Sequence, residues 1–485
     1  MDLRNSEILR TGSFINGQWL SSESGKTLAI HNPATGQLVA SVADLDASAA
    51  KIAIKAAYEA YKSWGKSGAK YRAKILRRWC ELLLDNCDDL AFLLSCEQGK
   101  PLAEARAEIR YGANYVSWFS EEATRIYGDV IAPPSADRRL LCIREPVGVV
   151  AAITPWNFPN AMLARKIAPA LAAGCTMVCK PAPNTPLSAL ALAALGEKAG
   201  IPKGVLNVIV GSDAAAIGHE MTKSELVRKI TFTGSTAVGR KLLAQSAASV
   251  KKTSMELGGN APFIVFADAD IEQAVTGAMA SKFRNAGQTC ISANRFLIHE
   301  GVLEDFLAKL LMKVEGLRLG NGVDEGVTMG PLIDLAAMRR VHEKVQQAID
   351  SGATLVTGGK PSSLGGSFYA PTILTGVRPG MRVFEEEIFG PVAAITSFQT
   401  EEEAISMANA THYGLAGYFY TASNKRIFRL AEEIECGIIG VNEGLVSNEM
   451  VPFGGIKQSG LGREGSKYGL EDYMEIKYLC LGGLL

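Results

Sequence analysis

The chain has 485 residues, of which 50 are Lys or Arg and 50 are Asp or Glu, so its formal net charge at pH 7 is zero. This balance disfavours a nucleic-acid or anionic-membrane partner, because both favour a basic protein. The hydrophobic fraction of 47% is far too high for a disordered chain, and the length predicts two or three domains. Nine irregularly spaced cysteines and five scattered histidines favour a reducing compartment and predict no metal site.

The start of the chain and its apolar runs predict a cytoplasmic protein. The first ten residues, MDLRNSEILR, contain acidic side chains and lack the apolar core of a signal peptide. The longest apolar runs, such as 167–179, are shorter than the ~18 residues that a membrane-spanning helix needs.

Two helices are predicted near the N-terminus, over residues 45–64 and 70–97. From about residue 147 to 256, apolar strands alternate with helices that end at glycine. This alternation indicates a doubly wound α/β sheet, which binds nucleotides at the carboxyl ends of its strands. The predicted strands are 147–154, 176–180, 205–210 and 230–233, and the predicted helices are 161–173, 187–199 and 237–248.

A second alternating region, from about residue 257 to 452, predicts a second α/β domain. Its first strands are predicted at 261–265 and 295–298, and its first helices at 271–283 and 302–317. Residues 140–144 and 473–481 are strand-like but lie outside both regions. Because they lack neighbouring strands in the sequence, we expect them to pair across a subunit interface.

The segment Gly234–Gly239 (GSTAVG) is a candidate phosphate-binding turn. It follows the predicted strand 230–233 and opens a helix, where backbone N–H groups and the helix dipole favour an anion. Thr236 replaces the second glycine of the dinucleotide-binding fingerprint. An ordinary strand-to-helix turn is therefore an equal alternative for this motif alone.

Three further residues have side chains suited to catalysis. Cys290 follows a Gly-Gln-Thr turn between a helix and a strand, where a thiolate can meet a ligand. Glu256 precedes two glycines and suits a partly desolvated general base. Asn157 lies in a turn fixed by two prolines and can donate to an oxyanion. Taken singly, a buried thiol, a surface carboxylate and a rigid loop are the plainer interpretations.

Taken together, these segments resemble the aldehyde dehydrogenase superfamily. TPWNFPN, CKPAPNTP, FTGSTAVG, MELGG, GQTC, EEEIFGP and PFGGIKQSGLGRE occur in the family's order over essentially the whole chain. The resemblance implies an α/β protein with a Rossmann-like cofactor domain over 1–125 and 147–256 and an α/β catalytic domain over 257–452. It also implies β oligomerisation segments at 126–146 and 453–485, in a homodimer or homotetramer.

The resemblance also implies roles for the catalytic residues. Cys290 is expected to attack the aldehyde carbon, with the Asn157 side chain and the Cys290 backbone N–H as oxyanion hole. Glu256 is expected to activate the water that hydrolyses the resulting thioester. Glu464 matches the glutamate that some accounts assign to a proton relay, and Lys166 matches the family's lysine near the active site. For each, a surface or structural ion pair is the stronger alternative.

The expected cofactor is NAD or NADP. The chain lacks the glutamate that NAD-preferring relatives carry, since Pro183 takes its place. Without that carboxylate a 2′-phosphate is not repelled, and Lys180 remains to pair with it, so we expect NADP to be preferred. The cofactor-binding residues implied by the resemblance are Ile153, Thr154, Trp156, Lys180, Pro183, Gly234, Ser235, Glu387 and Phe389.

Within the superfamily the chain is most similar to succinate-semialdehyde dehydrogenases, enzymes of GABA degradation. Arg165, Arg284 and Ser447 carry this similarity, and two guanidiniums and a hydroxyl suit a distal carboxylate on a small aldehyde. Glutarate semialdehyde and other ω-semialdehyde acids remain alternatives, because one methylene discriminates by only ~1–3 kcal/mol. A catalytically silent member with a binding or structural role is a third alternative, which the intact catalytic residues oppose.

Overall fold

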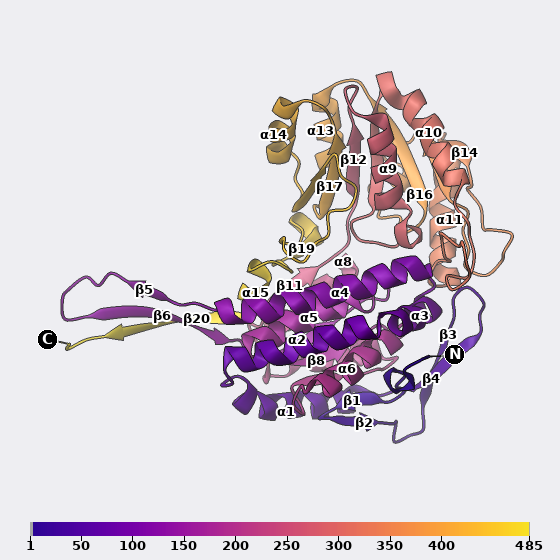
Figure 1. The fold of residues 1–485 in the computed structure, drawn as a ribbon. Coiled ribbons are helices and arrows are strands. Elements are labelled where there is room, and N and C mark those ends of the chain that lie inside the picture. Colours follow the sequence, from indigo (N-terminus) through magenta and orange to yellow (C-terminus); the bar gives the residue numbers. More distant parts are fainter. Residues whose placement is uncertain (1–2, 485) are drawn as a thin grey trace.

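The computed structural model describes residues 3–484 (Figure 1). Residues 1, 2 and 485, which the sequence assigns to the cofactor-binding domain and to an oligomerisation segment, lie outside the described part. Two α/β lobes lie one above the other in this view, and a small sheet projects from the side of the lower lobe. The predicted fold class is confirmed.

The lower lobe is built on an eight-stranded sheet with the order β19-β11-β10-β7-β8-β9-β1-β2. The five strands from β11 to β9 are parallel, as predicted for a doubly wound sheet. The strands are β1 (Ser13–Ile15), β2 (Gln18–Leu20), β7 (Val149–Ile153), β8 (Thr176–Lys180), β9 (Leu206–Val208), β10 (Val227–Thr233), β11 (Lys252–Glu256) and β19 (Gly460–Leu461).

Helices cover both faces of this sheet, so its central strands are buried on both sides. Val150 and Ala152 of β7 pack against one group of helices, and Val149 and Ala151 against the other, as the alternation of side chains in a strand requires. The first group is α2 (Ala69–Asp85), α3 (Cys87–Gln98), α4 (Leu102–Glu122), α5 (Ala161–Ala173) and α6 (Leu187–Ala199). The second group is α1 (Ala47–Trp64), α7 (Ala214–Lys223) and α8 (Thr236–Ala247).

The upper lobe has a seven-stranded sheet with the order β14-β15-β16-β13-β12-β17-β18, parallel except for β14. Its core is rich in aromatic rings from neighbouring strands, such as Phe263, Phe296 and Tyr418. The strands are β12 (Ala261–Val265), β13 (Ala293–His299), β14 (Thr354–Thr357), β15 (Thr372–Thr375), β16 (Val392–Phe398), β17 (Ala416–Tyr420) and β18 (Ile438–Val441). The main helices are α9 (Ile271–Lys282), α10 (Leu303–Glu315), α11 (Leu335–Asp350), α13 (Glu401–Asn409) and α14 (Asn424–Glu433).

The projecting sheet is made of β5 (Asp129–Ile131), β6 (Arg139–Pro146) and β20 (Met474–Leu481). The two strand-like segments expected to pair across a subunit interface instead pair with each other within the chain, antiparallel, from Met474 opposite Pro146 to Leu481 opposite Arg139. The sequence could not show this pairing, because more than 300 residues separate the segments. Strand β19 also lies within the predicted oligomerisation segment 453–485. It belongs to the eight-stranded sheet, where it pairs with β11, and not to the projecting sheet.

The N-terminal helices differ most from expectation. The single helix predicted over 70–97 is two helices, α2 and α3, because the chain turns at Asn86, whose side-chain amide donates to the carbonyl of Leu82 at 2.7 Å. Helix α4 was not predicted at all. By contrast, α5 and α6 have the predicted bounds. Within residues 3–484, no helix has both the length and the apolar character needed to cross a membrane.

Candidate active site

Cys290 lies in a loop whose backbone is unusual. Asn285, Ala286 and Gly287 have φ of 51°, 53° and 74°, so three consecutive residues adopt the left-handed region just before the cysteine. Only glycine fits at 287, because a Cβ there would lie 2.1 Å from the carbonyl oxygen of Gly390. The loop turns the chain from α9 toward β13 and leaves Cys290 between two cavities.

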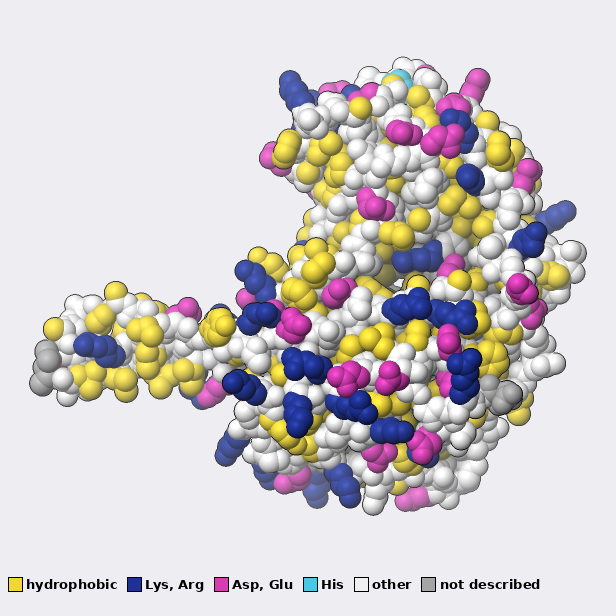
Figure 2. Space-filling model, viewed as in Figure 1, with side chains coloured by type: hydrophobic (Ala, Val, Ile, Leu, Met, Phe, Trp, Pro, Cys, Tyr) yellow, Lys and Arg dark blue, Asp and Glu magenta, His cyan; other side chains and the backbone are white. Residues whose placement is uncertain are grey.

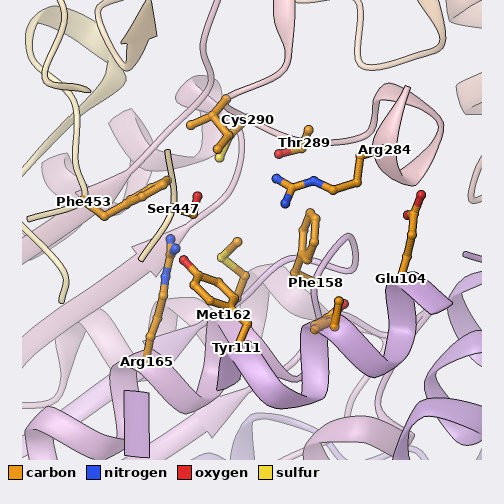
Figure 3. A pocket seen from close by; sticks show the side chains of 13 residues that line it. Glu104, Tyr111, Phe158, Met162, Arg165, Arg284, Thr289, Cys290, Ser447 and Phe453 are labelled. Carbon is orange, nitrogen blue, oxygen red and sulfur yellow. The ribbon is translucent and has the colours of Figure 1, made fainter. Parts of the chain in front are cut away.

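The first cavity, of about 170 Å³, lies between Cys290 and the helices of the lower lobe (Figure 3). It contains the predicted residues Arg165, Arg284 and Ser447, which come from α5, the turn after α9 and a loop after β18. The sequence therefore correctly places these three side chains together. The lining residues are Glu104, Ala107, Glu108, Tyr111, Phe158, Met162, Arg165, Arg284, Thr289, Cys290, Ile291, Ser447 and Phe453.

Both arginines in this cavity lie over aromatic rings. The guanidinium of Arg165 is 4.4 Å from the ring centre of Phe453, and that of Arg284 is 5.5 Å from the ring centre of Phe158. Figure 3 shows the two guanidiniums reaching the cavity from different sides. Nη2 of Arg165 and Nε of Arg284 are buried and have no hydrogen-bond partner within residues 3–484. The cavity therefore holds positive charge and unused donors, which suit an anionic ligand.

Arg165 also belongs to a buried ion cluster. Glu464 contacts the guanidinium of Arg165 and the ammonium of Lys166, and Lys166 lies 3.1 Å from the hydroxyl of Thr231. Burial opposes ionisation of Glu464, but the two cations outweigh it and lower its pKa. Glu464 and Lys166 thus form the ion pair that was the stronger of the two interpretations.

Glu256 ends β11 and is 2% exposed. Neither of its carboxylate oxygens has a hydrogen-bond partner among the described residues. Burial, and next the charge of Glu464, raise its pKa well above the usual range. A buried carboxyl with unused oxygens and a raised pKa suits proton transfer near neutral pH.

The Cys290 thiol and the Asn157 amide lie on loops that contact each other. Nδ2 of Asn157 donates to the carbonyl of Gln288 at 3.0 Å, two residues before Cys290. Burial raises the pKa of the Cys290 thiol to about 12, and the charge of Arg165 partly offsets this rise. Formation of the thiolate therefore depends on positive charge or a base brought near the thiol.

The second cavity, of about 290 Å³, lies on the other side of Cys290. Five predicted cofactor-binding residues line it: Trp156, Gly234, Ser235, Glu387 and Phe389. The rings of Trp156 and Phe389 meet edge to face with centres 5.5 Å apart. Asn157, Leu257, Gly258 and Arg340 are further lining residues.

The groups that line this second cavity suit a phosphate and a ribose, which a nicotinamide dinucleotide contains. Ser235 caps α8 by accepting a hydrogen bond from the N–H of Val238, so a 12-residue helix begins at the cavity wall and favours phosphate. Oε1 of Glu387 accepts from the N–H of Gly259 at 3.0 Å, and a Cβ on Gly258 would lie 2.9 Å from Oε2. Burial raises the pKa of Glu387 to about 7. The glycines thus leave room for a carboxylate that suits ribose hydroxyls.

The other four predicted cofactor residues lie at the same sheet edge but outside this cavity. Ile153 and Lys180 end adjacent strands and are paired in register, and the N–H of Thr154 donates to the carbonyl of Lys180 at 3.1 Å. Burial lowers the pKa of Lys180 to about 8, against the pull of two aspartates. Pro183 lines a larger third cavity, beside residues 28–36.

One wall of the first cavity was not predicted from the sequence. Glu104, Ala107, Glu108 and Tyr111 line it from α4. Their spacing of three, four and seven residues is that of one helix face, so a periodicity search over 102–122 could have found them. Arg340 of α11, in the second cavity, has no comparable signal. Among residues 3–484, no group of three His, Cys, Asp or Glu side chains is placed to hold a metal ion.

Comparison with known proteins agrees with this geometry. The model of the aldehyde dehydrogenase family matches residues 19–479, and the chain therefore belongs to the aldehyde dehydrogenase family of oxidoreductases. It is 56% identical to a 3-sulfolactaldehyde dehydrogenase of Pseudomonas putida, over 100% of this chain and 99% of that protein. It is 54% identical to a glutarate-semialdehyde dehydrogenase of Pseudomonas aeruginosa, over 100% of both chains.

Two further relatives carry another name. A succinate-semialdehyde dehydrogenase (NADP+) of Escherichia coli is 54% identical, over 99% of this chain and 100% of that protein. The crystal structure of a succinate-semialdehyde dehydrogenase from Burkholderia pseudomallei superposes with a TM-score of 0.98 at 53% identity, covering 99% of this chain and 100% of that one. The relatives thus share the fold and the family but differ in the aldehyde that their names give.

Proposed function

We propose that the protein oxidises succinate semialdehyde to succinate with NADP or NAD, through a thioester on Cys290. The observation that carries the proposal is the position of Cys290 between two cavities. One cavity holds Arg165, Arg284 and Ser447, and the other holds the residues that fit a dinucleotide. A carboxylate on the arginines would leave the aldehyde end of a short chain beside the thiol.

The first step is addition of the Cys290 sulfur to the aldehyde carbon. The new C–S bond places negative charge on the former carbonyl oxygen, which the Asn157 amide and the Cys290 N–H are suited to stabilise. A bound nicotinamide supplies the acceptor for the hydride that leaves this carbon. The attacking thiolate forms when the thiol releases its proton to solvent, and the charge of Arg165 assists this step because it offsets part of the rise that burial causes in the thiol pKa.

Hydrolysis of the thioester is assigned to Glu256. Its raised pKa makes it a stronger base than an ordinary carboxylate once it is ionised. It accepts a proton from water as the water oxygen attacks the acyl carbon, and the C–S bond then breaks. The sulfur leaves as a thiolate, the new carboxyl group ionises, and Glu256 releases its proton to solvent. The products are the dicarboxylate, the thiolate and two protons, and none of these steps uses a metal or a histidine.

We also propose that NADP is preferred over NAD. Support comes from Pro183, which provides no carboxylate against a 2′-phosphate, and from the buried ammonium of Lys180 at the end of β8. The name of the Escherichia coli relative agrees with this preference. A tenfold or larger preference for NAD in kcat/KM would contradict it.

Glutarate semialdehyde is the second candidate substrate, since a relative at 54% identity carries that name. The name of the relative at 56% identity adds a sulfonated aldehyde, whose anionic end the same arginines could bind. All three aldehydes have a terminal anion. The arginines therefore support aldehydes with an anionic end as the substrate class, without favouring one of the three.

We further propose that the projecting sheet joins subunits of a homodimer or homotetramer. Hydrophobic side chains gather on it in Figure 2, and Val130, Ile476 and Tyr478 are 80%, 61% and 58% exposed. An exposed apolar sheet of this kind is rare on a monomer. Light scattering of the intact chain and of Ile476→Glu tests this: the variant should dissociate, and an unchanged mass would oppose the proposal.

One experiment tests substrate and cofactor together. Steady-state rates are measured for C2–C6 aldehydes with a terminal carboxylate, a terminal sulfonate or no charge, each with NADP and with NAD. We expect the highest kcat/KM for succinate semialdehyde with NADP. A higher kcat/KM for glutarate semialdehyde or 3-sulfolactaldehyde would make that aldehyde the preferred substrate instead. Equal kcat/KM values for uncharged aldehydes would contradict the anion-binding role of the arginines.

A further inference from the structure

We propose that Asn285 is a positioning residue, which holds the oxyanion donor Asn157 and the Cys290 loop in one fixed arrangement. The inference rests on the proposed function. The Nδ2 group of Asn285 donates to the carbonyl of Asn157 at 2.9 Å and to the carbonyl of Gln288 at 3.1 Å. One side-chain amide thus bridges the two loops that carry the reacting groups.

The bridge orients the Asn157 side chain as well as its backbone. Nδ2 of Asn157 donates one of its two hydrogens to the same carbonyl of Gln288, at 3.0 Å. Because this contact uses one hydrogen, the second hydrogen of the amide remains available for the oxyanion that forms beside Cys290. A shift of Gln288 would therefore move the oxyanion donor relative to the nucleophile.

The backbone conformation of Asn285 is unusual, and two hydrogen bonds with other segments fix the residue in place. Its φ of 51° lies in the left-handed region, which asparagine tolerates better than other non-glycine residues. Nε2 of Gln98 donates to its Oδ1 at 2.9 Å, and a carboxylate oxygen of Glu104 accepts from its N–H at 2.8 Å. An uncommon backbone conformation held by so many contacts is typical of sites where geometry must be fixed.

The Asn157 carbonyl has a second donor on its other side. Nζ of Lys100 lies 2.8 Å from it and 2.6 Å from Oε2 of Glu108, and both charged groups are fully buried. The other oxygen of Glu108 accepts the N–H groups of Asn160 and Ala161, where α5 begins. The oxyanion loop is therefore fixed by Asn285 on one side and by the Lys100 ion pair on the other.

The test compares two reactions of the same thiol. Cleavage of p-nitrophenyl acetate passes through a tetrahedral oxyanion: sulfur bonds to the acyl carbon and p-nitrophenolate leaves, with no dinucleotide required. Alkylation by iodoacetamide forms a C–S bond and expels iodide without any oxyanion. Misplacement of the oxyanion donor should therefore slow the first reaction and not the second.

The variants are Asn285→Gly, which keeps the left-handed backbone without strain, and Asn285→Asp, which keeps the shape but removes both N–H donors. We expect kcat for aldehyde oxidation and the rate of ester cleavage to fall by about 10- to 100-fold in both. KM for aldehyde and for NADP should change less than about threefold, and so should the alkylation rate of Asn285→Gly. Equal losses in ester cleavage and alkylation, or no loss in either, would overturn the proposal.

Asn207 provides a matched control. It is also buried, its Nδ2 donates to the carbonyls of Met177 and Gly204 at 3.2 and 2.8 Å, and its Oδ1 accepts from the N–H of Asn16. Asn207→Asp should lower the melting temperature and leave the ratio of ester cleavage to alkylation unchanged. If the native chain oxidised no aldehyde, the proposed function would fail, whereas this ratio would still decide the role of Asn285.

Discussion

The two cavities that meet at Cys290 offer different chemical groups to a ligand. In the first, the cationic groups are the long side chains of Arg165 and Arg284, which lie over aromatic rings. In the second, the groups that a ligand would meet are the N-terminus of α8 and the glycines near Glu387. The backbone itself therefore lines this cavity. Changes on one side should therefore leave recognition on the other side intact.

Removal of Cys290, the proposed nucleophile that lines both cavities, should have the largest effect. In Cys290→Ala no covalent intermediate can form, so we expect NADPH formation to fall by at least about 10³-fold. Both cavities keep their other walls, so NADP should still quench tryptophan fluorescence, with Trp156 as the reporter. An unchanged rate would remove Cys290 as nucleophile. A native chain that binds NADP but oxidises no aldehyde would support the silent-member alternative.

Replacement of the base should slow only the hydrolytic half of the reaction. We expect Glu256→Gln to lower kcat by about 10²- to 10³-fold, while a rapid burst of NADPH equal to the sites remains. In the native chain the pKa of Glu256 is raised, so the carboxyl becomes protonated, and kcat falls, as pH is lowered through that raised value. The variant should lack this acid limb. Loss of the burst would mean that Glu256 acts in a step before the thioester forms.

Arg284 offers the cleaner test of the first cavity, because Arg165 also holds Glu464. A hydrogen bond to a charged group contributes about 1.5–3 kcal/mol, so Arg284→Ala should raise KM for succinate semialdehyde roughly 10- to 150-fold. Arg284→Lys keeps the charge but not the planar fork, so its KM should lie between those of the native chain and of Arg284→Ala. An uncharged C4 aldehyde is the control, and an equal rise in its KM would contradict anion recognition by Arg284.

The sequence predicted the parallel sheet, the bounds of α5 and α6, and the grouping of Arg165, Arg284 and Ser447 around one cavity. Local patterns determine the strands and the helix bounds, whereas the resemblance to the family implied the grouping of the three side chains. It did not predict α4 or the contacts of Lys100 and Asn285, which join segments 57 and 128 residues from Asn157. Such contacts depend on how helices pack against the sheet, and no local pattern in the chain encodes that packing.

The smallest expected effect concerns the cofactor, since Pro183 and Lys180 lie away from the reacting groups. Pro183→Glu places a carboxylate at the sheet edge near Lys180, where it would repel a 2′-phosphate and accept from ribose hydroxyls. We expect the ratio of kcat/KM for NADP over NAD to fall by about tenfold, with kcat unchanged. Pro183→Gln, which has the same size but no charge, should change the ratio less. If both variants behave alike, size rather than charge at this position sets the preference, and the argument from the missing carboxylate fails.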